Sequence, residues 1–174
     1  DSRVEAVPPP ALTDMTVSVR YPDYLRSEGS SEVDWSSTYQ SGLRLREGSD
    51  VTLTAKSSVP MGESDLLVKT DTGELTEVPL RYSDDRMSVS MTLGDIRSAT
   101  TISIVPSDAD GISAQAPYRY FLGVVLDEPP ELEMRLKGIG TAVTPIARIP
   151  IEAMATDDYG VSDLVISVTP AGEN

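Results

Sequence analysis

The sequence contains no cysteine and no histidine. The lack of cysteine excludes disulfides, a thiolate nucleophile and cysteine-rich zinc sites within these residues. The lack of histidine removes the commonest general base and the commonest ligand of transition metals. Catalytic triads that depend on either residue are therefore excluded, and we expect the chain not to be an enzyme.

Adjacent acids are the remaining candidates for acid–base chemistry, and they occur at Asp84-Asp85 and Asp157-Asp158. Two carboxylates can share a proton or flank a glycosidic bond. However, adjacent residues of a strand point to opposite faces, and adjacent acids in turns are usually solvated. The pairs therefore add little support for catalysis.

Aromatic residues and long apolar runs are also scarce. The chain has one Trp, one Phe and seven Tyr, so its core must be mostly aliphatic. No apolar run reaches the roughly 20 residues that span a bilayer, and no signal peptide is visible. The chain starts at Asp1 and stops at Asn174 within a strand-like pattern. We expect both ends to be cuts in a longer protein, with any membrane contact made by a segment outside these residues.

Acidic residues dominate the charge, which is −14 from 28 acidic and 14 basic side chains. A field of this sign repels phosphate backbones and anionic membrane surfaces, so we expect no nucleic-acid partner. It attracts divalent cations or basic partners, and it also serves solubility without any partner.

Apolar and polar residues alternate along most of the chain, which is typical of half-buried strands. Alternating runs occupy the stretches 15–19, 51–55, 78–82, 87–93, 102–104, 118–124 and 132–136. No helical stripe of useful length accompanies them. The sequence therefore predicts an all-β protein with an immunoglobulin-like or fibronectin-like antiparallel β-sandwich, and a barrel is the alternative.

Proline clusters divide the chain, because proline cannot donate to a central ladder. Pro8-Pro9-Pro10 precedes the first strand, and Asp127-Glu128-Pro129-Pro130 follows the strand that ends near Leu126. We therefore predict an extended linker at 1–10, an immunoglobulin-like sandwich at 11–126, and a truncated second unit at 127–174.

An internal repeat supports the second boundary. Pro10-Ala11-Leu12 resembles Pro130-Glu131-Leu132, and a longer set of matches is separated by 98 positions. The longer set pairs Val51, Leu53, Ala55, Gly62, Asp65 and Leu66 with Ile149, Ile151, Ala153, Gly160, Asp163 and Leu164. On this basis 127–174 holds about the first three strands of a second sandwich, whose apolar faces would be partly bare.

The first unit differs from the second by a serine-rich insertion between Tyr24 and Leu43. It predicts a long loop, or a loop with a short edge strand, and long loops often carry binding. Trp35 and Tyr39 are the candidate ligand contacts, and the alternative for Trp35 is that it closes one end of the core.

Two acidic segments are candidate calcium ligands, since hard cations favour oxygen ligands around a glycine turn. Asp108 and Asp110 lie in an Asp-x-Asp-Gly segment, and Asp157 and Asp158 precede Gly160. The complete loop of a helix–loop–helix calcium site is absent. The alternative is a β-turn whose carboxylates accept backbone N–H groups.

Three tracts share features with a known group of proteins. They are the stretch from Ala155 to Leu164 with its Asp-Asp-Tyr-Gly-Val turn, the stretch from Thr101 to Pro130, and the opening from Pro8 to Tyr24. Together they resemble the tandem immunoglobulin-like region of large bacterial membrane-anchored proteins of unknown function. The resemblance implies a periplasmic or cell-envelope location and an anchor outside these residues, and it supplies no catalytic residues.

These observations leave three hypotheses for function. The first is a structural or protein-interaction module of a larger bacterial envelope protein, which contacts a protein partner or neighbouring domains of its own chain. The second is a calcium-stiffened adhesion or ligand-binding module. The third is an accessory carbohydrate-binding domain of an enzyme, in which Trp35, Tyr39, Tyr118 and Tyr120 would stack on sugars. Alternation with Leu122 and Val124 predicts that the last two point inward, against that use.

Overall fold

The computed structural model of the chain describes residues 8–26, 34–76, 78–137 and 150–167. They form the strands β1 to β12 and one short 3-10 turn, Asp23–Leu25, with no α-helix among them. The chain divides into two compact units, Asp1–Leu126 and Asp127–Asn174, called unit 1 and unit 2 below. Among the described residues no helix has the length and apolar character needed to cross a membrane.

One layer of unit 1 is a five-stranded antiparallel sheet, called sheet 1. Its order is β2 (Trp35–Thr38), β1 (Leu12–Arg20), β4 (Ser49–Ser57), β8 (Ser88–Ile96) and β7 (Arg81–Tyr82). The edge strand β2 belongs to the serine-rich insertion, where the sequence predicts a loop or a short edge strand. The part of that insertion at 27–33 lies outside the described residues.

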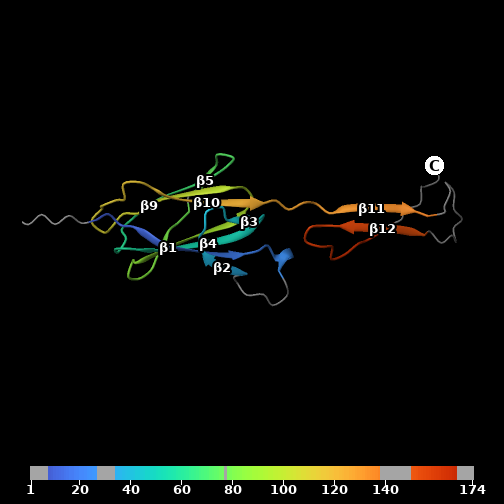
Figure 1. Cartoon of the computed structure of the whole chain (residues 1–174), viewed down its shortest axis with the longest axis horizontal. Coiled ribbons are helices and arrows are strands. Elements are labelled where there is room, and N and C mark those ends of the chain that lie inside the picture. Colours follow the sequence, from blue (N-terminus) through green and yellow to red (C-terminus); the bar gives the residue numbers. More distant parts are fainter. Residues whose placement is uncertain (1–7, 27–33, 77, 138–149, 168–174) are drawn as a thin grey trace, which may run out of the picture. The chain divides into compact units, whose positions relative to one another are not determined.

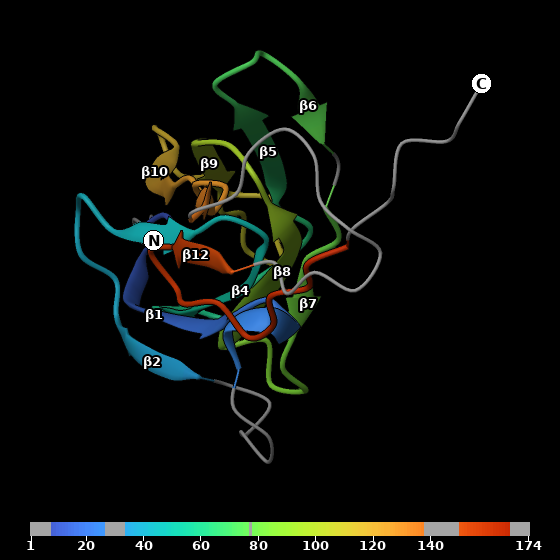
Figure 2. The same cartoon turned by 90° about the vertical axis from the view of Figure 1, so that its right-hand side faces the viewer.

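The second layer, sheet 2, also has five strands. Its order is β3 (Arg44–Arg46), β10 (Tyr118–Val125), β9 (Thr100–Val105), β5 (Asp65–Thr70) and β6 (Leu75–Thr76). Only β3 runs parallel to its neighbour, β10. Figure 1 and Figure 2 show the two layers facing each other.

The strand order is that of an immunoglobulin-like sandwich. Strands β1-β4-β8-β7 correspond to A-B-E-D, and β6-β5-β9-β10 correspond to C′-C-F-G. The chain leaves sheet 1 after β2 and joins sheet 2 as β3, so one N-terminal segment supplies an edge to each sheet. The all-β sandwich predicted from alternation is confirmed, and the barrel is not formed.

Both sheets bury one face, because alternate residues along each strand point into the space between them. Sheet 1 contributes Val17, Val19, Val51, Leu53 and Met91, and sheet 2 contributes Leu45, Ile102, Ile104 and Leu122, all at most 2% exposed. The core is aliphatic, as the scarcity of aromatic residues predicts. Pro10, which the sequence assigns to the linker, is also fully buried in unit 1.

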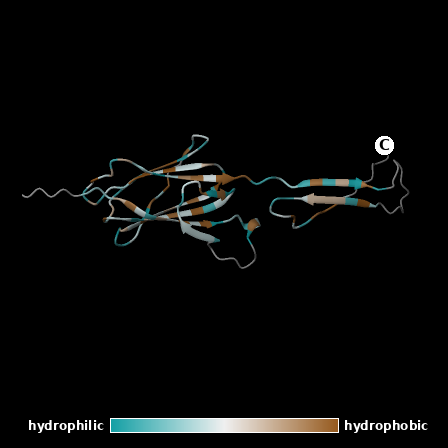
Figure 3. Ribbon diagram, viewed as in Figure 1, coloured by the Kyte–Doolittle hydropathy of each residue, from teal (hydrophilic) through white to brown (hydrophobic). Residues whose placement is uncertain are grey.

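Unit 2 contains a single hairpin in its described part, β11 (Glu131–Leu136) paired antiparallel with β12 (Ile151–Thr156). Leu132, Met134 and Leu136 share one face with the β12 residues Ile151, Ala153 and Ala155, which lie opposite them. Figure 3 shows the resulting alternation of apolar and polar residues along β11.

The apolar residues of β11 are bare in the structure, with Leu132 at 59% and Met134 at 57% exposed. The third strand expected after Gly160 is not formed through residue 167, which corrects that part of the prediction. Its unit 1 counterpart, β5, is held between β9 and β6. No described strand of unit 2 offers such a neighbour, so the segment lacks a ladder to join.

An ion pair closes the base of the serine-rich insertion. The guanidinium of Arg26 lies 3.3 Å from the carboxylate of Asp34, and both side chains are only 13% exposed. The same carboxylate accepts a 2.7 Å hydrogen bond from the backbone N–H of Tyr21, and the Asp34 N–H donates to the Val19 carbonyl. Asp34 therefore fixes both the start of β2 and the chain that leaves β1.

We predict that Asp34→Ala lowers the free energy of unfolding by about 3 kcal/mol, because it removes the shielded carboxylate that lies closest to the Arg26 guanidinium and that also accepts from the Tyr21 N–H. The control is Asp23→Ala, which removes an acid that contacts the same Arg26 but is 88% exposed. That control should cost less than about 0.5 kcal/mol. Urea unfolding followed by Trp35 fluorescence measures both, and equal losses would refute the special role of Asp34.

Candidate functional site

The acids nominated as calcium ligands in unit 1 lie in a tight turn between β9 and β10. Asp108 is buried, and one of its carboxylate oxygens accepts hydrogen bonds from the N–H groups of Asp110 at 3.0 Å and Ile112 at 2.8 Å. Gly111 closes the turn with a φ of 82°. That oxygen therefore holds the turn together, as in the β-turn that the sequence offers as the alternative to a cation site at Asp108.

This turn is pressed against the loop before β5. The Gly62 N–H donates to the Ser107 carbonyl at 2.8 Å, and Met61 forms an isolated bridge with Asp108. A Cβ on Gly62 would lie 2.1 Å from the Asp108 carbonyl oxygen, so only glycine fits there. In the sequence Gly62 stands out only as a match in the repeat, and the contact with Asp108 explains why a glycine is needed.

The second acidic pair lies in unit 2, after β12. The carboxylate of Asp157 accepts a 3.2 Å hydrogen bond from the Tyr159 N–H, while Asp158 is exposed. The structure does not bring either pair together with a third acid, because the part of the chain that it describes holds no group of three metal-ligating side chains. Calcium binding at these four residues stays a prediction.

Trp35 lies at the start of β2, opposite Val19 of β1. Its ring is partly buried and packs against the core cluster. The position agrees with a residue that covers the edge of the core.

Tyr39 connects the two sheets. Its backbone N–H donates to the Met15 carbonyl at 2.7 Å, which holds it to sheet 1. Its hydroxyl donates to the Phe121 carbonyl at 3.0 Å and accepts from the Phe121 N–H at 2.9 Å. The hydroxyl therefore makes the two hydrogen bonds with Phe121 that a neighbouring strand would make. The strand β3 takes over this edge of β10 from Gly123 onward. Tyr39 has a structural role, and its contact with a ligand stays a prediction.

The tyrosines of β10 point inward, as the alternation with Leu122 predicts. Tyr120 is 8% exposed and packs edge-to-face on Tyr39, with ring centroids 5.2 Å apart. Burial raises the pKa of Tyr120 to about 12, and the nearby Tyr118 and Tyr39 add to the rise. A buried ring cannot stack on a sugar, so Tyr120 is removed from the carbohydrate-binding hypothesis.

The acid pair at Asp84-Asp85 lies in the hairpin turn between β7 and β8. The Asp85 carboxylate accepts from the Ser83 hydroxyl at 2.6 Å and from the Met87 N–H at 3.0 Å. The Ser83 hydroxyl and, to a lesser extent, the Met87 N–H hold the pKa of Asp85 below its usual value. Asp85 is therefore ionised at neutral pH and poorly suited to donate a proton.

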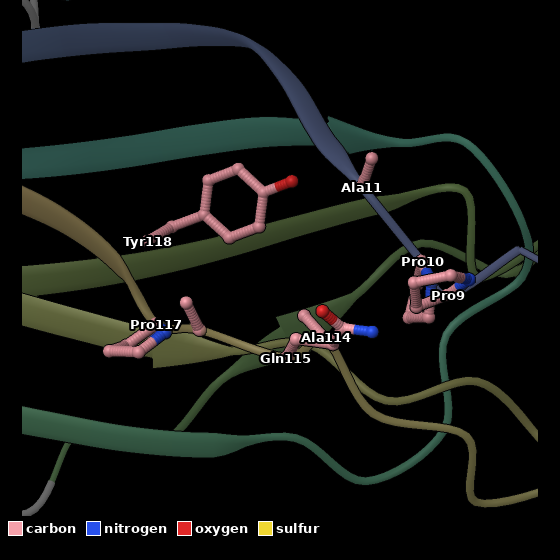
Figure 4. Close-up of a pocket in the computed structure, with 8 residues that line it drawn as sticks. Pro9, Pro10, Ala11, Ala114, Gln115, Pro117 and Tyr118 are labelled. Carbon is pink, nitrogen blue, oxygen red and sulfur yellow. The ribbon is translucent and has the colours of Figure 1, made fainter.

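An open hollow of about 480 Å³ lies between the Pro9–Ala11 segment and the Ala114–Tyr118 segment. Figure 4 shows the Tyr118 ring between these segments, with its hydroxyl directed toward Ala11. The lining consists of proline and alanine with Gln115 and Tyr118, and it includes no charged side chain.

Comparisons with known proteins add little to this picture. No protein-family model matches the chain, and no curated protein matches it. Among solved structures, CopC from Methylosinus trichosporium OB3b is similar over 50% of this chain and 86% of its own, at 13% identity and a TM-score of 0.38.

We predict that Asp108→Ala lowers the free energy of unfolding by about 1–2 kcal/mol, because two backbone N–H groups lose their acceptor. The control Asp110→Ala changes an exposed acid of the same turn and should cost less than about 0.5 kcal/mol. If Asp108 and Asp110 also bind calcium, the melting temperature of the unaltered chain should be higher in millimolar calcium than in EDTA, and Asp110→Ala should abolish that rise. Equal melting temperatures in the two conditions would refute the cation site and leave Asp108 with its role in the turn.

The buried phenol predicts a loss of stability in alkali. A raised folded-state pKa means that Tyr120 contributes stability fully below its unfolded pKa of about 10. That contribution is lost as the pH rises through about 12. Absorbance titration of tyrosinate should show one group that ionises late and together with unfolding, and Tyr120→Phe should remove it. Ionisation of every tyrosine near its ordinary pKa in a folded chain would contradict the burial.

Proposed function

We propose that the chain is a non-catalytic structural or protein-interaction module of a larger bacterial envelope protein, in which immunoglobulin-like units follow one another. The observation that carries this proposal is the strand pairing of unit 2, which repeats the pairing of the first two core strands of unit 1. The extracytoplasmic location and the membrane anchor outside these residues rest on the sequence resemblance alone.

The repeat can be followed pair by pair. Leu53 of β4 lies opposite Val17 of β1. Its match 98 positions later, Ile151 of β12, lies opposite Leu136 of β11. The sequence match therefore extends to the partner strand.

The other end of each strand pair shows the same correspondence between the two units. Ser57 lies opposite Leu12, and its match Ala155 lies opposite Leu132. Leu12 and Leu132 are the residues that the two Pro-x-Leu openings align. Two sequence matches found far apart thus meet in one strand pair, which supports β11–β12 as the A–B pair of a second unit.

Unit 1 differs from unit 2 in one local detail. Between Leu12 and Val17, β1 carries a bulge near Asp14, which has a φ of 50°. The corresponding segment of β11 pairs without interruption. The strand β1 has one extra residue at the bulge. This explains why the sequence separation between matched residues is one residue longer for Leu12 and Leu132 than for Val17 and Leu136.

An A–B pair alone has no second sheet to cover its apolar face, and a two-stranded hairpin in water is marginally stable at best. The bare face formed by Leu132, Met134 and Leu136 matches the inward face of β1. A tandem module explains this face, because the later strands of the second unit would cover it. No such explanation follows from a catalytic role.

Hydrogen exchange tests the tandem proposal. We predict that in residues 1–174 the amides of β11 and β12 exchange through local opening that costs at most a few kcal/mol. The amides of β4 and β9 should exchange only when unit 1 unfolds globally. When the chain is extended with the residues that follow Asn174 in its parent protein, the β11 and β12 amides should gain protection. A matched variant, Met134→Asp, should prevent that gain, whereas Glu133→Lys on the opposite face should not.

Strong protection of β11 and β12 in residues 1–174 would contradict the proposal, since the hairpin would then be complete by itself. Unchanged exchange in the extended chain would also overturn it.

A further inference from the structure

The outer face of sheet 2 has a charge opposite to that of the whole chain. Its strands carry Arg44, Arg46, Lys69 and Arg119 but a single acid, Asp65. The whole sequence carries −14. A basic sheet in so acidic a chain is a local feature of the fold and does not follow from composition.

Several of these cations lack a carboxylate partner. Across the residues that the structure describes, Arg44, Lys69, Arg81 and Arg119 form no ion pair, whereas most other basic side chains do. Three of the four point outward from sheet 2, and Arg81 points outward from sheet 1. All four are exposed. In an acidic chain, unpaired cations gathered on one sheet leave that sheet able to attract an anion.

Large apolar side chains lie between these cations. Phe121 is 48% exposed, Leu67 is 49% exposed and Leu75 is 62% exposed. The register places Leu75, Lys69, Thr101 and Phe121 in one row across the sheet. A second row contains Leu67, Ser103 and Arg119. Each of the two neighbouring rows therefore contains both apolar and basic side chains. These two rows and Arg44 are called the cationic face below.

Gly123 brings Arg44 into this surface. A Cβ on Gly123 would lie 3.2 Å from the Arg44 side chain and 3.7 Å from the Phe121 ring. The absence of that Cβ lets the stem of Arg44 cross over β10 beside Phe121. An aromatic ring flanked by guanidinium groups is the composition that is enriched at the energetic centres of protein interfaces.

The outer face of sheet 1 has a different chemistry. It presents rows of serine and threonine whose hydroxyl groups pair with each other, as Ser18 does with Ser36 and Thr52 with Thr92, both at 3.0 Å. These groups satisfy one another within the sheet. The two sheets thus differ, and only sheet 2 combines unpaired charge with exposed apolar area.

We propose that the cationic face binds an acidic protein segment whose carboxylates alternate with apolar side chains. Charge complementarity selects this partner, because Lys69, Arg119 and Arg44 attract carboxylates while Phe121 and Leu67 bury apolar groups between them. The inference rests on the proposed function as an interaction module and names the surface and the partner chemistry.

The probe is a short synthetic peptide that alternates glutamate and leucine, titrated into the full chain by calorimetry at low salt. Two comparison peptides replace glutamate by lysine or leucine by serine. We expect binding of the first peptide only, with an affinity that falls as salt is added. The double variant Lys69→Glu with Arg119→Glu, and separately Phe121→Ser, should each weaken binding by about tenfold or more.

Arg81→Glu is the matched control, because it reverses an exposed, unpaired strand cation on sheet 1. It should change the affinity by less than about twofold. All the altered side chains are exposed, so circular dichroism should show every variant folded.

Four results would overturn the proposal: no binding of the glutamate–leucine peptide, equal binding of the lysine peptide, an equal loss with Arg81→Glu, or self-association of the chain through Phe121 in sedimentation. Binding to phosphatidylserine vesicles in place of the peptide would also overturn it. The hydrogen-exchange test of β11 and β12 is independent of this face, so a failure here leaves the tandem module intact, and the reverse also holds.

Discussion

The crossing of the chain from one sheet to the other is the constraint on which unit 1 depends. The edges of the two sheets face each other on the flank where the chain passes between them, and β1 and β10 form those edges beyond the short strands β2 and β3. Tyr39 spans that flank, with its main chain bonded to Met15 and its hydroxyl bonded to both peptide groups of Phe121. β3 then continues along β10, so Leu45 enters the core at the point where the hydroxyl bonds end.

Much of the fold could be predicted from local pattern. The alternation that identifies β1, β4 and β8 is a direct consequence of strand geometry, so each of these strands was placed from apolar spacing alone. The pattern also identified β11, but it could not show that Met134 stays exposed. Burial depends on whether another layer covers the strand, and that is a property of the assembled sheets.

The candidate sites show the limit of the same reasoning. Asp108 and Asp110 suit a cation by residue type and spacing, yet the bonds that the Asp108 carboxylate makes with backbone N–H groups are visible only once the turn is formed. Asp34 carries no motif at all, because its partner Arg26 lies across the insertion. The outward cations of sheet 2 were available from the alternation, since Lys69 and Arg119 are out of phase with the buried Val68 and Tyr120. What the sequence could not supply was the strand order, which puts Lys69 and Arg119 on one sheet with β9 between their strands.

The order of the strands along the chain has a mechanical consequence. β1 is the first strand of unit 1, so a pull on the two ends of the unit reaches β1 before β2 and β3. The segments that precede β1 and β10 line one hollow, so both strands begin at the same end of the sandwich, and β10 leads to Leu126 at the other end. Because β1 pairs with β4 along most of its length, the pull slides β1 along β4 and loads the hydrogen bonds of that pair together rather than one after another. Resistance to force then depends on the rate at which this pair breaks, and not on the equilibrium stability of the whole sandwich.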